Sequence, residues 1–336
     1  MDFTMVLKKL RDGADLDDEE ASQSFLEVMD GRASSQQAAA YLALLGAKGE
    51  TVAEIAAFAK AMRKGLQKAE FNTPNLVDTA GTGGDGKGTF NISTCAAIIA
   101  AGAGSKVAKH GNRSATGRCG SADVMEELGV TMAADMGAAE AQLNKAGLTF
   151  LFAPYFHKSM RNVSGIRKEL GFKTVFNILG PLTNPMHARR QVIGSYDKAV
   201  AGKLAGACGI LGAEKALVVS SDIDEISVSG ETQVYEVDNG RIKSYTLNPE
   251  DFGFSRCDVA GILAEGRAGS ADTIIKVLSG REGPARSVAL LNAGAAVYAS
   301  GEAGSIAHGV TMAERSVDSG MALEKLRLLR DFNGHS

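Results

Sequence analysis

The sequence predicts an α/β fold, with a small all-helical domain plus a larger α/β domain whose central, mostly parallel sheet is flanked by helices. Two observations predict it. Residues 1 to about 70 contain no strand-like run, and after them short β-branched runs alternate with alanine-rich helical stretches. The length of 336 residues suits about two domains, and a composition of 45% hydrophobic and 22% charged residues is that of a globular protein.

Helix-capping residues predict several helices in the first segment. Asp17 or Asp18 precedes an acidic first turn, and Ser34 or Ser35 can cap a helix that ends near residue 45. Thr51 is followed three residues later by a glutamate, which is the spacing of a capping box. The composition changes at residues 71–75, so the second domain is expected to start there.

Short β-branched runs in the second segment predict the strands of the sheet. The predicted strands are VDTA (77–80), KVAK (106–109), LTFLF (148–152), TVFNI (174–178), QVIGSY (191–196) and ALVVSS (216–221). The stretches 93–102 and 122–129 are predicted as helices. Residues 232–237 and 241–247 flank Asn239-Gly240, which predicts a small antiparallel hairpin.

Charge and composition exclude several function classes. Lys and Arg number 36 against 39 Asp and Glu, for a net charge of -3, and aromatic residues make up only 6%, so no nucleic-acid partner is expected. None of the four cysteines lies in a C-x-x-C pair, which leaves no zinc or redox motif. The longest apolar stretch, 95–104, is too short to span a bilayer, and the N-terminus lacks the apolar core of a signal peptide. We therefore expect a cytoplasmic protein with no membrane partner.

A glycine-rich loop, GTGGD at 81–85, follows the first predicted strand and precedes NIST at 91–94, which opens a helix. Glycines let backbone N–H groups approach a phosphate, and the helix N-terminus adds free donors and a favourable dipole. The alternative is a tight strand-to-helix connection in which Ser93 and Thr94 act as ordinary caps. The loop matches neither the Walker pattern nor G-x-G-x-x-G.

A basic cluster, KHGNRS at 109–114, follows the next predicted strand and runs on through Arg118 to Ser121. Cations among hydroxyls and glycines at the end of a strand suit a polyanionic ligand. A solvated basic loop is the alternative reading. Surrounding cations disfavour protonated His110, so we expect it to position a ligand rather than to act as a base.

The adjacent carboxylates Asp224 and Glu225 follow another strand. Mg²⁺ keeps several waters and is commonly bound by one or two carboxylates together with substrate phosphates, so this pair suits magnesium better than zinc. An exposed acidic turn is the alternative for the pair by itself. Together with the two phosphate-type loops it indicates a magnesium-dependent pyrophosphate site.

A fourth stretch joins Arg167, in NVSGIRKELG at 162–171, to the rigid turn FNILGPLTNP at 176–185. The prolines indicate rigidity, and the guanidinium of Arg167 could form a fork for a carboxylate. A surface salt bridge is equally compatible with Arg167.

In this order, GTGGD, NIST, KHGNRS, GSADV (120–124), FNILGPLTNP and DEIS (224–227) resemble the anthranilate phosphoribosyltransferase family, over nearly the whole chain. The resemblance implies a discontinuous helical domain, 1–70 and about 161–187, and an α/β domain, 71–160 and about 188–336. It also implies a homodimer formed through the helical domain, two Mg²⁺ per subunit, and anthranilate and phosphoribosyl pyrophosphate as substrates in tryptophan biosynthesis.

The resemblance also assigns site residues. The activated sugar would be held by Gly81, Gly84, Asp85, Thr89, Asn91, Ile92, Ser93, Thr94, Lys109, His110, Gly111, Asn112, Arg113, Ser114, Ala115, Thr116, Gly117 and Ser121. Anthranilate would be received by Gly81, Asn112 and Arg167, with His110, His157, Gly180 and Pro181 along its path. Ser93, Asp224 and Glu225 would bind metal, and Lys109 and Asp85 would stabilise the transition state, without an acid or base.

The chain departs from the family pattern at 115–120, where ATGRCG replaces the usual VSSKSG. Gly117 and Cys119 remove two hydroxyl donors, so we expect weaker side-chain contacts to phosphate there. The alternatives are a pyrimidine nucleoside phosphorylase, which needs no paired-carboxylate metal loop, and a non-catalytic relative that binds nucleic acid. Asp224-Glu225 argues against the first alternative, and the net charge argues against the second.

Overall fold

The computed structural model describes residues 2–66, 73–84, 86–114 and 119–332. It opens with four helices, α1 (Phe3–Arg11), α2 (Asp18–Met29), α3 (Ser35–Lys48) and α4 (Val52–Lys64). The predicted caps are confirmed: Asp17, Ser34 and Thr51 each form a capping box with the residue three positions on. The all-helical start of the chain is therefore set by local sequence.

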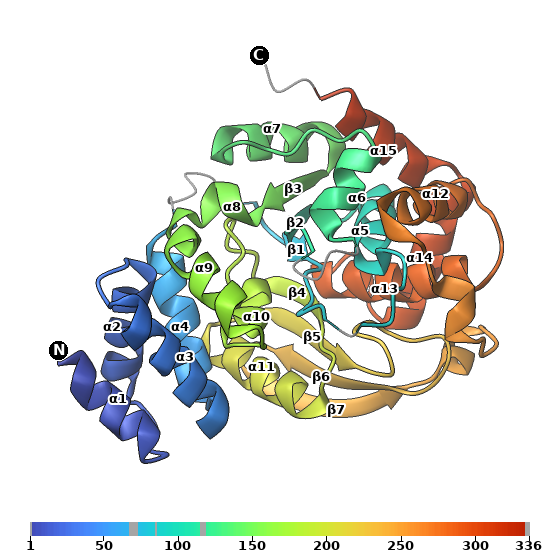
Figure 1. Ribbon diagram of the computed structural model, residues 1–336. Helices are drawn as coiled ribbons and strands as arrows, with labels where there is room; N and C mark the ends of the chain where they lie inside the picture. The colour runs from blue at the N-terminus through green and yellow to red at the C-terminus, as the bar shows by residue number, and fades with distance from the viewer. Residues whose placement is uncertain (1, 67–72, 85, 115–118, 333–336) are drawn as a thin grey trace.

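Two later helices pack on this group: α9 (Arg161–Leu170) contacts α2 and α3, and α10 (Phe176–Leu179) contacts α4. Val163 and Phe176 share one apolar core with Phe25 and Phe58. The rings of Phe25 and Phe176 lie 5.2 Å apart. Figure 1 shows α9 and α10 between the first helices and the sheet. Arg167, on α9, is thus carried by the helical bundle.

The sheet has seven strands in the order β3-β2-β1-β4-β5-β6-β7. Strands β1 to β5 pair in parallel, and β6 and β7 pair antiparallel at one edge. Their bounds are β1 Val77–Asp78, β2 Val107–Gly111, β3 Leu148–Phe152, β4 Arg190–Gly194, β5 Lys215–Ser220, β6 Thr232–Asp238 and β7 Arg241–Leu247. Asn239 and Gly240 both have positive φ, 46° and 82°, as a type I′ hairpin turn requires.

Helices cover both faces of the sheet (Figure 1). On one face lie α5 (Ile92–Gly102), α13 (Pro284–Ser300), α14 (Ile306–Asp318) and α15 (Met321–Arg330), and on the other α7 (Met136–Ala146) and α11 (Lys198–Ile210). The remaining helices are α6 (Ser121–Glu127), α8 (Ala153–Phe156) and α12 (Gly266–Leu278), with 3₁₀ turns at Lys158–Met160, Gly180–Leu182, Pro249–Phe252 and Val259–Ile262. In the described part of the chain, no helix is long and apolar enough to cross a membrane.

One strand prediction is wrong. Residues 174–178 lead into the helical turn α10 instead of forming a strand. The Thr174 N–H donates to Oδ1 of Asn177, and the turn ends at Gly180-Pro181, where proline supplies no backbone donor. The apolar side chains of Phe176, Ile178 and Leu179 are all buried, whereas in a strand Ile178 and Leu179 would point to opposite faces of the sheet. Local capping therefore overrides the β-branched composition of this run.

Candidate active site

The glycine-rich loop lies where the strand order changes direction. After β1 the chain enters the loop, and the next strands fall on one side of β1 while β4 falls on the other, which is the position of ligand sites in open α/β sheets. The Thr82 N–H donates to the Gly194 carbonyl at 2.8 Å. A Cβ on Gly81 would lie 3.0 Å from that carbonyl, and one on Gly194 would overlap the Asp224 carbonyl. Three loops therefore meet at a point where only glycine fits.

Lys109, in the middle of β2, is buried, with only 2% of its surface exposed. Its ammonium donates to the carbonyl and hydroxyl of Thr79 at 2.9 and 3.2 Å and to Oγ of Ser93 at 3.2 Å. Burial lowers the Lys109 pKa, while Asp78 and Glu225 act in the opposite direction. The geometry therefore fixes a cation between the glycine-rich loop and the start of α5.

Glu225 lies on the other side of Ser93 and accepts the Ser93 N–H at 3.1 Å. Although the residue keeps some exposed surface, desolvation of its carboxylate and the neighbouring Asp224 raise the Glu225 pKa to about 8. A bound divalent cation would favour the ionised form of both groups, so the pair fits the magnesium that the sequence predicted. Among the described residues no third carboxylate, histidine or cysteine completes a cluster, so substrate oxygens would complete the coordination.

Asp78, the last residue of β1, is completely buried beside these loops. Its Oδ1 accepts the His110 N–H at 3.0 Å, and its Oδ2 accepts from Nδ2 of Asn184 at 2.8 Å. Asn184 also donates to the Ala108 carbonyl at 2.8 Å. Burial raises the Asp78 pKa to about 6. This carboxylate therefore joins β1, β2 and the turn GPLTNP at 180–185, called the GPLTNP turn below.

Two buried histidines face the GPLTNP turn, with ring centroids 5.1 Å apart. Because carbonyls only accept, Nδ1 of His110 donates to Gly180 at 3.1 Å and Nε2 of His157 donates to Thr183 at 3.0 Å. Burial lowers their pKa values, to about 3 for His110 and about 4 for His157. In the described part of the chain, Nε2 of His110 is buried with no hydrogen-bond partner. Both rings are therefore neutral at pH 7, and His110 offers a free acceptor atom.

Arg167 makes no ion pair within the described residues. It is half-buried, and its guanidinium carbon lies 5.4 Å from the centre of the Phe176 ring. Stacking on an aromatic face leaves the N–H fork of an arginine available for a carboxylate. The surface salt bridge that the sequence left open for Arg167 is therefore absent among the described residues.

Other predicted residues are placed less directly. Oδ1 of Asn91 accepts from Ser270 at 2.7 Å and from Cys119 at 3.2 Å, and Thr89 forms an isolated bridge with Leu263. The Thr94 hydroxyl is buried without a partner among the described residues. The predicted site residues Asp85, Ala115, Thr116 and Gly117 lie outside the described residues, as do residue 118 and the side-chain contacts expected there.

Sequence reasoning missed five residues of the site. Asp78, Thr79, Asn184, Gly194 and Lys173 hold its loops together, the last by donating to the Gly84 carbonyl at 3.0 Å. The strand-end position of the first two could have indicated a role, because functional groups collect at the carboxyl ends of parallel strands. Gly194 ends the parallel strand β4 and shares this position, whereas Lys173 had no such signal, since its partner lies far away along the chain.

The chain matches two families of protein domains. Residues 73–323 match the glycosyl transferase family, a/b domain, and residues 4–65 match the glycosyl transferase family, helical bundle domain. It is 47% identical over 331 residues to anthranilate phosphoribosyltransferase of Pelotomaculum thermopropionicum, covering 98% of this chain and 96% of the relative. It is 46% identical to the enzyme of the same name from Methanocorpusculum labreanum, covering 96% of each.

Solved structures agree with these sequence matches. Anthranilate phosphoribosyltransferase from Thermus thermophilus has a TM-score of 0.91 at 40% identity, covering 98% of this chain and 100% of that one. The Saccharomyces cerevisiae enzyme in complex with PRPP and Mg has a TM-score of 0.90 at 29% identity, covering 98% and 97%. The chain therefore belongs to the anthranilate phosphoribosyltransferase family.

Proposed function

We propose that this enzyme transfers the 5-phosphoribosyl group of phosphoribosyl pyrophosphate (PRPP) to the amine of anthranilate, giving N-(5-phosphoribosyl)anthranilate and pyrophosphate in tryptophan biosynthesis. The observation that carries the proposal is the meeting of Lys109, the glycine-rich loop and the Asp224-Glu225 pair at the change of strand direction. One cation, a glycine-rich loop before a helix N-terminus and a metal-binding pair together suit a diphosphate leaving group.

The activated sugar is assigned to the large sheet domain. The proposed ligands are the glycine-rich loop at 81–85, Thr89, the NIST turn at 91–94, residues 109–112 and 114–117, and Ser121. Support comes from the N-terminus of α5, which lies just after the glycine-rich loop and carries no side-chain cap, so that the positive end of its dipole favours an anion. The pyrophosphate would lie against Lys109.

Magnesium fits the pair Asp224 and Glu225, with Ser93 beside them. Bound there together with the substrate, it would neutralise charge that develops on the departing pyrophosphate. We propose two ions per subunit, because a pyrophosphate presents oxygens on two phosphoryl groups. The yeast relative solved with PRPP and Mg supports the use of this metal.

Anthranilate is assigned to the side of the site formed by Arg167, Asn112 and the GPLTNP turn. The unpaired fork of Arg167 suits the carboxylate, and the neutral rings of His110 and His157 line a path of low charge to Gly180 and Pro181. The yeast enzyme has been solved with 4-fluoroanthranilate, an analogue of this acceptor. Aromatic amine and carboxylate would thus be held by different parts of the site.

The reaction then depends on charge and position. As the bond between C1 of the ribose and pyrophosphate breaks, negative charge grows on the leaving group, and the fixed positive charge of Lys109 beside the glycine-rich loop would stabilise it. The aryl amine is neutral at pH 7 and attacks C1 from the opposite face, so no general base is required. Neither histidine serves as one here, because burial lowers the pKa of His110 to about 3 and that of His157 to about 4, which makes both rings weak bases.

Two further assignments follow from the family. We propose a discontinuous helical domain, 1–70 with about 161–187, and a homodimer formed through it in the cytoplasm. Support for the domain division comes from the core that Val163 and Phe176 share with the first helices. The site would then lie between two bodies that close on the substrates and exclude water.

The proposal is tested by following anthranilate fluorescence in purified enzyme with PRPP and Mg²⁺, then again with EDTA. We expect a magnesium-dependent decay with one pyrophosphate released per anthranilate consumed. Absence of decay at high enzyme concentration, together with phosphorolysis of pyrimidine nucleosides, would contradict the proposal and indicate a nucleoside phosphorylase.

A further inference from the structure

The connection from β2 to α6 leaves and returns through one narrow neck. A Cβ on Gly120 would overlap the Ser114 nitrogen and lie 2.5 Å from the Asn112 carbonyl oxygen, so the two ends of the connection touch at their backbones. The Asn112 carbonyl also accepts the Ala122 N–H at 3.2 Å. Residues assigned to the activated sugar lie at both ends of this neck.

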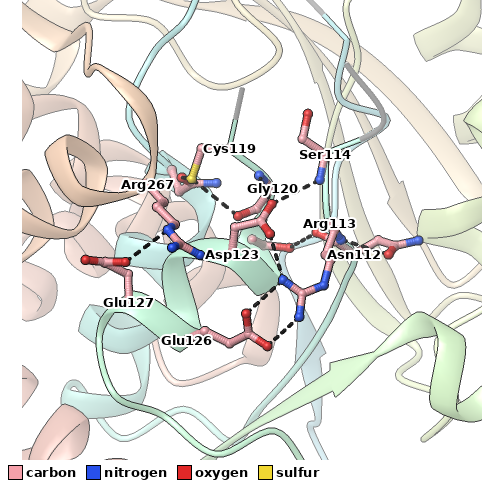
Figure 2. A network of polar contacts seen from close by, with 11 residues as sticks. Asn112, Arg113, Ser114, Cys119, Gly120, Asp123, Glu126, Glu127 and Arg267 are labelled. Atoms are coloured by element: carbon pink, nitrogen blue, oxygen red, sulfur yellow. Dashed lines mark hydrogen bonds and ion pairs between the residues drawn. The ribbon is translucent and has the colours of Figure 1, made fainter. Parts of the chain in front are cut away.

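Asp123, in the first turn of α6, binds both ends of the neck (Figure 2). Its Oδ2 accepts the Gly120 N–H at 2.8 Å and the Ser114 N–H at 3.2 Å. Its Oδ1 accepts from Nη1 of Arg113 at 3.0 Å. These donors hold the Asp123 pKa below its usual range, so the carboxylate is ionised at pH 7.

Arg113 has the same carboxylate as a partner and a second one as well. Its guanidinium forms a two-point contact with Glu126, at 2.8 and 2.5 Å, and lies 5.6 Å from the centre of the Phe152 ring. Both terminal nitrogens of the guanidinium are therefore engaged by carboxylates of α6 (Figure 2). The sequence had predicted that Arg113 binds the activated sugar directly.

We propose that Asp123 and Arg113 form a clasp that holds the backbone around Asn112, Ser114 and Gly120 in the shape that receives the activated sugar. Arg113 is then a positioning residue, and it also neutralises the carboxylate that the clasp places near a polyanion. The inference rests on the proposed function, since it concerns how the same PRPP site is built. A preformed cradle improves binding because the donors need not be ordered when the ligand arrives.

The test compares KM for each substrate in the full-length enzyme with Asp123→Asn, which keeps the side-chain volume but loses one acceptor and the charge. We expect KM for PRPP to rise about tenfold, as for a lost hydrogen bond to a charged group, with KM for anthranilate within about twofold. Glu127→Gln is the matched control, because Glu127 lies on the same helix and pairs with Arg267 at 3.2 Å, outside the clasp. The control should leave both constants unchanged.

A double variant separates positioning from direct binding. If Arg113 acts through Asp123, adding Arg113→Gln to Asp123→Asn raises KM for PRPP little further, whereas a direct phosphate ligand would multiply the two effects. Multiplied effects, an unchanged KM for PRPP, or equal rises in both KM values would overturn the clasp. If Asp123→Asn does not fold, Asp123→Glu and Glu126→Gln carry the same comparison. An inactive unmodified enzyme would overturn the proposed function instead.

Discussion

The two sides of the site, to which we assign the activated sugar and anthranilate, differ in charge. On the sugar side, ionisable groups from β1, β2 and the 224–225 loop are buried together and linked through Thr79 and Ser93. On the acceptor side there is one half-buried cation over an aromatic ring and two neutral histidines bound to carbonyls. The ionisable groups of the sugar side are linked by hydrogen bonds, whereas the acceptor side carries little charge.

The difference fits the two ligands. A diphosphate gains charge as it leaves, and fixed charges in a desolvated frame stabilise that change without reorganising. An aryl amine is neutral and needs orientation more than stabilisation. Changes on the sugar side should therefore lower turnover, and changes on the acceptor side should mainly weaken binding of one substrate.

The largest effect is expected for Lys109→Met, which keeps the apolar stem and removes the charge. We expect kcat to fall by about 10²–10³-fold, the range seen when one transition-state donor is removed. Initial rates at saturating PRPP and anthranilate measure it. Lys106→Met, at an exposed lysine just before β2, is the control and should retain its rate. A fall below tenfold would remove Lys109 from transition-state stabilisation.

The metal pair should come next. Asp224→Asn with Glu225→Gln is expected to shift the magnesium titration of activity to higher concentration and to lower kcat, because the remaining amide oxygens bind Mg²⁺ weakly. Asp222→Asn serves as the control. Asp222 lies in the same loop, where its carboxylate accepts a hydrogen bond from the Ser229 hydroxyl. A magnesium titration identical to that of the unmodified enzyme would show that the metal binds elsewhere.

On the acceptor side, Arg167→Ala should raise KM for anthranilate about 10- to 100-fold and change KM for PRPP much less, since it removes only a carboxylate fork. Initial rates measured while both substrate concentrations are varied give both KM values. Lys168→Ala, the exposed neighbour on α9, controls for loss of helix charge. Equal rises in both KM values would contradict the assignment and with it the contrast between the two sides.

The smallest effect concerns stability and pH. Burial lowers the His157 pKa from 6.5 to about 4. Between these pH values the imidazole is protonated in the unfolded chain and neutral in the folded chain. This contribution is full above pH 6.5 and is lost as pH falls towards 4. Between pH 7 and pH 5 it amounts to about 2 kcal/mol from the size of that shift.

Denaturant unfolding at several pH values would measure it. His157→Gln keeps a donor for the Thr183 carbonyl but cannot titrate. The free energy of unfolding of this variant should therefore fall by about 2 kcal/mol less between pH 7 and pH 5 than that of the unmodified enzyme. His308→Gln, on the exposed surface of α14, should leave the slope as it is. Comparing variants is necessary because the raised Asp78 pKa acts in the opposite direction between pH 6 and 4. Parallel curves for His157→Gln and the unmodified enzyme would show that His157 does not titrate in this range.

The sequence predicted those features that depend on neighbouring residues. The caps at Asp17, Ser34 and Thr51 and the turn at Asn239 are read from short spacings, because a cap or a hairpin turn is closed by residues within a few positions. The same reasoning failed at 174–178, where β-branched residues suggested a strand. There the Asn177 cap and the shared core with Phe25 decide for a helical turn.

The fold class, the phosphate-type loops and the acidic pair can be predicted from the sequence, since each is a local pattern with its own chemistry. Which of these groups touch depends on the packing of the whole chain. This packing joins Lys109 to Thr79 and Ser93, brings Gly194 against the Asp224 carbonyl, and turns Arg113 towards Asp123 and Glu126. Such contacts follow from sheet order and helix packing, which sum weak interactions over the whole chain and leave no short pattern in the sequence.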